Sequence, residues 1–140
     1  MTATKAQSSI EFLLLLAAST AALLVLVGAS KAVFFSGLFA LDIQNAQGFL
    51  SELNAKSDML SFFGEGSFLK AKASFFGSAR IFSEGGFVLI EVKSPVLLQS
   101  KLLRQKTSTE VTAFVPETNG HVLVELVRTG TGVLIKDSDS

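Results

Sequence analysis

The chain has 140 residues, of which 49% are hydrophobic, and its 12 basic side chains balance its 12 acidic ones. This length fits one small domain together with an apolar anchor. A net charge of zero argues against a nucleic-acid-binding protein, which would present a basic face. The sequence contains no cysteine, which excludes disulfides, thiolate metal sites and a cysteine nucleophile.

The chain begins with a short polar segment that leads directly into a long apolar one. Lys5 is the only charged residue among the first six, and no charged residue occurs from Phe12 to Ala29. As a helix, these 18 residues would span roughly 27 Å at about 1.5 Å per residue, close to the thickness of the hydrocarbon core of a bilayer. The sequence therefore predicts a membrane-entering helix.

Glu11 lies at the threshold of this helix and is open to two interpretations. The carboxylate could simply benefit from the positive end of the helix dipole. Alternatively it has a specific partner in an assembled state, because ionisable groups at membrane depth are candidates for function.

Gln7, Ser9 and Glu11, followed at once by the leucine run, resemble the Q-x-S-x-E motif of archaeal type IV pilin precursors with a class III signal peptide. The small residue Ala6 stands where many such leaders carry glycine. The resemblance implies a processing motif of Lys5, Gln7, Ser9 and Glu11, with cleavage between Ala6 and Gln7 by a membrane-embedded prepilin peptidase.

The competing interpretation is an ordinary secretory signal peptide cleaved near residues 30–32. The apolar run is longer than the usual 7–15 residues, and Glu11 is at its start, so pilin-type processing is favoured.

The resemblance further implies assembly into a helical filament of copies of this chain. The new amine of Gln7 would pair with Glu11 of a neighbour, and the apolar helices would form the filament core. Before assembly the partners would be the membrane, the prepilin peptidase and the pilus assembly machinery, and the assembled filament would be extracellular. The predicted assembly residues are Gln7, Glu11, Phe12, Leu13, Leu16, Leu23, Leu24 and Val27.

Helical periodicity continues beyond the apolar run. Seven residues spaced alternately four and three apart form one stripe, and polar residues, Asp42 among them, are expected on the other faces. The helix should end near Phe63, since Gly64 follows. The stripe consists of Phe39, Ile43, Ala46, Leu50, Leu53, Ser57 and Leu60.

From Ser67 the hydrophobic period changes to two, which predicts strands. Breaks are expected at Gly77 and Gly85-Gly86, a strand over 96–104, and a hairpin turn at 116–120 around Asn119-Gly120. Short turns between consecutive strands favour an antiparallel meander. The predicted fold class is therefore α+β: a leader (1–6), a long N-terminal helix (7–63) and a small antiparallel β-sheet head (64–140).

No convergent set of catalytic residue types is present, and the single histidine, His121, is expected to be structural. We therefore predict no enzyme activity, no cofactor, no metal site and no nucleic-acid partner. The sequence predicts a structural subunit of an extracellular type IV pilus-like filament for adhesion or surface attachment. The alternatives are a monomeric membrane-anchored extracellular binding module, or a minor pilin or pseudopilin of a secretion or uptake machine.

Overall fold

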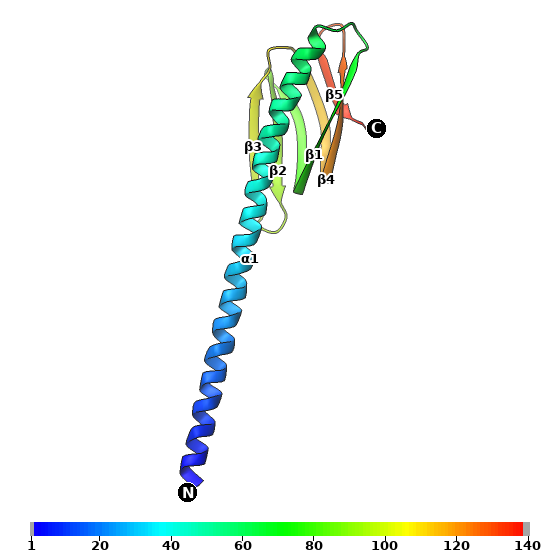
Figure 1. Ribbon diagram of the computed structural model, residues 1–140. Helices are drawn as coiled ribbons and strands as arrows, with labels where there is room; N and C mark the ends of the chain where they lie inside the picture. Colours follow the sequence, from blue (N-terminus) through cyan, green and yellow to red (C-terminus); the bar gives the residue numbers. More distant parts are fainter. Residues whose placement is uncertain (1, 139–140) are drawn as a thin grey trace. The chain divides into compact units, whose positions relative to one another are not determined.

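The computed structural model describes the backbone of residues 2–138 and the side chains of residues 9–138. One long N-terminal helix, α1 (Thr2–Ser61), precedes a curled five-stranded sheet, as Figure 1 shows. The predicted α+β class, with a helix followed by a largely antiparallel sheet, is confirmed. The strands are β1 (Phe68–Glu84), β2 (Phe87–Ser94), β3 (Gln99–Lys106), β4 (Val111–Arg128) and β5 (Val133–Asp137).

The chain divides into two units, Met1–Ser36 and Gly37–Ser140. The boundary falls within α1, because residues 37–61 of this helix belong with the sheet. In the second unit, five members of the predicted stripe are buried, while Phe39 and Ile43 are only half-buried. Buried positions on α1 are Asp42, Ala46, Phe49, Leu50, Leu53, Ser57 and Leu60.

Asp42 corrects the predicted helix faces. This carboxylate was expected on the polar face, yet its residue is only 1% exposed. Asp42 lies among the stripe residues Phe39, Ile43 and Ala46, on a helix face where the periodicity predicts apolar side chains. A partner on the sheet, which the sequence pattern does not reveal, makes burial of a charged group tolerable here.

The strand order in the sheet is β3-β2-β1-β4-β5, so the expected simple meander is wrong beyond β3. The first three strands do form consecutive antiparallel hairpins. The chain then returns across the sheet, and β4 pairs with the other edge of β1. At the β1–β2 turn, Gly85 and Gly86 have φ of 58° and 81°, as a two-residue hairpin with glycine at both central positions allows.

Two irregularities in the β1–β4 pair explain two wrong predictions. Gly77 does not end a strand: residues 75–77 of β1 form a bulge between the Ser74–His121 and Ser78–Asn119 pairs. The hairpin turn at 116–120 is not formed either, because these residues lie inside β4. Pro116, which has no N–H, lies where β4 gains an extra residue against β1, a position that tolerates proline.

These bulges let β4 bend around β5. The last strand pairs in parallel register with residues 111–114 of β4, and residues 124–128 of the same strand also lie against it in the opposite direction. The predicted strand over 96–104 is displaced, since β3 spans Gln99–Lys106 and residues 95–98 form a turn. One hydrophobic core therefore joins α1 residues 46–60 to four of the five strands, with Leu103 of β3 packed against it.

Candidate functional site

The apolar segment of α1 is uncovered in the first unit. An 18-residue window of this helix has a mean hydropathy of 2.5, and none of the window is buried. The described part of the chain thus contains one helix whose length and composition are compatible with membrane anchoring. Among the described side chains, the apolar residues predicted for assembly are all exposed: Phe12 65%, Leu13 58%, Leu16 51%, Leu23 60%, Leu24 75% and Val27 50%.

The hydroxyl groups within this segment are satisfied by the helix itself. The Ser19 hydroxyl donates to the Leu15 carbonyl at 2.7 Å, and the Ser30 hydroxyl donates to the Leu26 carbonyl at 2.8 Å. Thr20 donates to the carbonyls three and four residues before it. Back-bonding of this kind allows a hydroxyl to enter an apolar environment without leaving an unpaired donor.

The residues of the predicted processing motif are only partly described. Ser9 and Glu11 are exposed on α1. The side chains of Lys5, Ala6 and Gln7 lie outside the described residues.

In the second unit, polar side chains of α1 cover the edge of β1 residues 68–77, which has no strand partner on that side. β2 pairs with β1 only from Ser78 onward. The Asp42 carboxylate accepts the N–H groups of Phe76 and Gly77, at 2.7 and 2.8 Å. Both amides belong to the β1 bulge, so a single buried carboxylate satisfies the donors that this bulge releases from the ladder.

Two further α1 side chains extend this arrangement along the edge. The Asn45 amide donates to the Ser74 carbonyl at 3.1 Å, and the Lys56 ammonium donates to the Lys70 carbonyl at 2.5 Å. Lys56 also pairs with Glu52, one turn earlier, at 2.6 Å. The helix therefore protects this edge of β1 from pairing with another chain, a role that the sequence pattern did not reveal.

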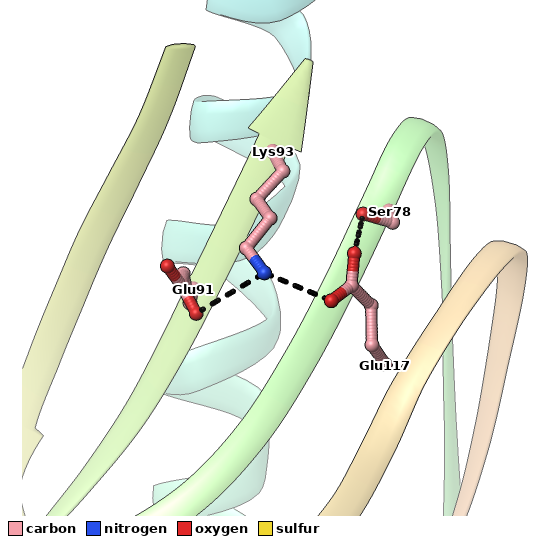
Figure 2. Close-up of polar contacts among 4 residues, drawn as sticks. All are labelled: Ser78, Glu91, Lys93 and Glu117. Atoms are coloured by element: carbon pink, nitrogen blue, oxygen red, sulfur yellow. Dashed lines mark hydrogen bonds and ion pairs between the residues drawn. The ribbon is translucent and has the colours of Figure 1, made fainter. Parts of the chain in front are cut away.

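A second polar cluster lies near the β4 bulge (Figure 2). Glu117 follows Pro116 and reaches across β1 to Lys93 on β2, with Oε2 2.8 Å from Nζ. Its other oxygen accepts the Ser78 hydroxyl at 2.6 Å. Glu91 lies 3.8 Å from the same ammonium. The hydrogen bond from Lys93 is the main cause that lowers the pKa of Glu117, and the same bond raises the pKa of Lys93.

This cluster is an ion pair at the surface of the sheet. The side chains of Lys93 and Glu117 are 39% and 45% exposed, and their pKa shifts favour both charged forms. The cluster ties β2 to β4 across the intervening strand β1.

The Nδ1 atom of His121 on β4 is hydrogen bonded to the Ser74 hydroxyl on β1, at 2.8 Å. It borders a hollow of about 440 Å³ whose lining includes Lys72 and Asp137. Among the side chains of residues 9–138, no three His, Asp or Glu groups gather as metal ligands. The hydrogen bond between His121 and Ser74 links the paired strands β1 and β4.

Comparisons with protein-family models, with curated proteins and with solved structures found no match to this chain.

Proposed function

We propose that this chain is the precursor of a structural subunit of an extracellular, archaeal type IV pilus-like filament. The observation that carries the proposal is the uncovered apolar segment of α1, preceded directly by Gln7, Ser9 and Glu11. An exposed apolar surface of this extent needs either lipid or protein around it. A pilin uses both in turn, first the membrane and then its sister subunits.

The proposed mechanism begins with the precursor held in the membrane. Cleavage after Ala6 removes the leader and creates a charged amine on Gln7. Glu11 of one subunit then offsets the amine of its neighbour. Two charges removed from water are tolerated as a pair, so this pairing fixes the axial register between adjacent helices. Repetition of one heterologous contact that does not close into a ring yields an open helical polymer.

The apolar side chains supply the attraction that follows. Exposed residues such as Phe12, Leu16 and Leu24 leave lipid and pack against copies of themselves. Small residues, including Ala17, Ala21 and Gly28, allow the helices to approach closely. Because the hydroxyls of Ser19 and Thr20 already have acceptors within the helix, they do not oppose this transfer. The head provides the outer surface of the filament, and its role is structural rather than catalytic.

The processing step is tested by the mass of the native protein. The expected mature chain begins at Gln7. A chain that retains Met1, or one that begins near Val33 after ordinary signal-peptide cleavage, would remove the basis of the proposal.

The assembly step is tested with the variant Glu11→Ala. It should be cleaved normally but should fail to assemble, because the amine of the neighbour loses its counter-charge. Electron microscopy of purified material should show fibres for the wild type and dispersed particles for the variant. Normal fibres from Glu11→Ala would contradict the pairing role. Dispersed wild-type particles in detergent would instead indicate a monomeric anchored module.

A further inference from the structure

Exposed apolar side chains gather at the end of the second unit where α1 enters it. Leu41 of α1 is 47% exposed, and the next residue, Asp42, accepts the N–H group of Phe76, which is 65% exposed. The turn between β2 and β3 carries Val96 and Leu98, which are 55% and 91% exposed. We call these four apolar residues, Leu41, Phe76, Val96 and Leu98, the apolar collar.

Backbone contacts bring the members of the apolar collar to one end of the sheet. The N–H group of Gly77 donates to the same Asp42 carboxylate at 2.8 Å. Gly77 also lies so close to β2 that a Cβ on it would be 2.0 Å from the Lys93 carbonyl oxygen. Lys93 is followed by Ser94, the last residue of β2, and then by the turn. Figure 1 shows this turn at the end of the sheet where α1 enters the second unit.

Leu98 has an unusual backbone conformation for its residue type. Its φ of 51° is positive, and no other non-glycine residue among those described shares this feature. Leucine is strained there, whereas glycine or asparagine is accommodated. The side chain is 91% exposed, so packing of the core does not require leucine either. The second unit alone therefore gives no reason for an apolar side chain at this position.

The sequence that leads into the apolar collar indicates which partner covers it. Between Phe12 and Leu41 the only charged residue is Lys31, and Asp42 is the first acidic residue after Glu11. As a helix, this stretch would measure roughly 45 Å at about 1.5 Å per residue, close to the thickness of a bilayer with its headgroup regions. A lysine near the end of a span can extend its ammonium to the headgroups. The apolar surface of the anchor thus continues into the apolar collar.

The charged groups near the turn are compatible with contact between the apolar collar and lipid. The β2–β3 turn borders a hollow of about 370 Å³, and of the described residues that line it only Lys93 and Glu117 are charged. These two are paired with each other at 2.8 Å (Figure 2). Asp42 is buried and bound to two backbone N–H groups. Lys72 and Asp137 border a separate hollow lined by β1, β4 and β5, where they can stay hydrated.

From this continuity we propose that the apolar collar inserts into the lipid surface while the chain is anchored in the membrane. The partner is the boundary between the headgroups and the acyl chains, and the inference rests on the membrane-held stage of the proposed function. The sequence has no tryptophan or tyrosine, the residues that usually occupy this level of a bilayer. The apolar collar would give the head a lipid contact of its own and cover these side chains until the subunit leaves the membrane.

Single tryptophans test the apolar collar, because the natural chain has none. The full chain is reconstituted into phosphatidylcholine vesicles. Leu98→Trp should emit at a shorter wavelength than Phe62→Trp and should be quenched several-fold more strongly by bromine-labelled lipid. Phe62 is the matched control, since it is 89% exposed and directly follows α1, roughly 30 Å along the helix from Leu41 at about 1.5 Å per residue. Leu24→Trp, within the apolar segment, reports on the anchor and should also be quenched.

Val96→Trp repeats the measurement at a second position of the turn, in case Leu98→Trp distorts it, and should also be quenched. If Leu24→Trp is quenched but Leu98→Trp and Val96→Trp are quenched no more than Phe62→Trp, the lipid contact is overturned and the anchor stands. Short-wavelength emission without quenching at both turn positions would mean that protein covers the turn, and would also overturn the lipid contact. Absence of quenching of Leu24→Trp would overturn the anchor, and the proposed function with it.

Discussion

Replacing Asp42 with alanine should be among the most destabilising single changes in the second unit, Gly37–Ser140. The carboxylate is 1% exposed and accepts two backbone N–H groups from the β1 bulge, those of Phe76 and Gly77. Alanine removes both acceptors and leaves no other acceptor in their place. The change also releases the contact that ties α1 to the bulge.

The expected loss follows from the environments of the two amides. A hydrogen bond to a charged group contributes about 1.5–3 kcal/mol, and a buried donor left without a partner costs about 1–3 kcal/mol. The hydrogen bond from Gly77 is buried, whereas the one from Phe76 is only part-buried, so the loss is larger at Gly77. We therefore expect Asp42→Ala to lower the free energy of unfolding by about 3 kcal/mol. For a unit of this size, that corresponds to a fall in Tm of roughly 10–20 °C.

The measurement combines denaturation with hydrogen exchange. Tryptophan and tyrosine are absent from the sequence, so unfolding is followed by circular dichroism in detergent. Exchange at the amides of Phe76 and Gly77 should accelerate in Asp42→Ala. Asp42→Asn keeps one acceptor oxygen, so its free energy of unfolding should lie between those of the wild type and Asp42→Ala. Asp58→Ala loses only contacts to the Ser108 and Thr109 hydroxyls, and should cost under about 1 kcal/mol. Stability of Asp42→Ala within about 0.5 kcal/mol of the wild type, the usual effect of a surface change, would refute the reasoning.

Three further predictions concern a glycine, the anchor and the surface ion pair. Gly77→Ala should prevent folding of the head or cost at least about 3 kcal/mol, because its Cβ would lie 2.0 Å from the Lys93 carbonyl oxygen; Gly64→Ala, with nothing within 4 Å, should be nearly neutral in the same denaturation assay. Leu15→Lys should lower the membrane-bound fraction on cell fractionation, since a lysine inside a span is unfavourable, by up to about 2.5–3.5 kcal/mol at its centre; wild-type membrane yield would count against the anchor. Lys93→Met should raise the pKa of Glu117 toward its usual value in an NMR titration, because the lowered pKa depends first on that ammonium. The contribution of Glu117 to stability is present above its unfolded-state pKa and is lost as the pH falls through its lowered folded-state pKa. Lys93→Met should therefore reduce the loss of stability on acidification. An unchanged pKa of Glu117 in Lys93→Met would contradict the role given to the Lys93 ammonium.

The arrangement of the head explains how an apolar helix and a sheet coexist in one small chain. Residues 46–60 of α1 fill the core, while Asp42, Asn45 and Lys56 cover the open edge of β1. Unpaired strand edges invite pairing with other chains.

The sequence alone predicted the elements that depend on neighbouring residues in the chain. The uncharged run from Phe12 predicts a long apolar helix, since its hydrophobicity is continuous and no proline interrupts it. The change of period at Ser67 predicts the start of the sheet, and Gly85-Gly86 predicts a turn that is formed. These features depend on residues close together in the chain, where propensity and periodicity act directly.

The tertiary structure decided what depends on distant partners. Gly120 has a φ of 78°, as a turn would require, but it lies opposite the β1 bulge inside β4. Pro116 likewise occupies a bulge and not a turn, because β1 offers a long pairing surface on both sides of it. Asp42 is buried because two amides more than thirty residues away point at it. Periodicity reports which side of an element is apolar, but only the folded chain determines which buried polar group finds a partner.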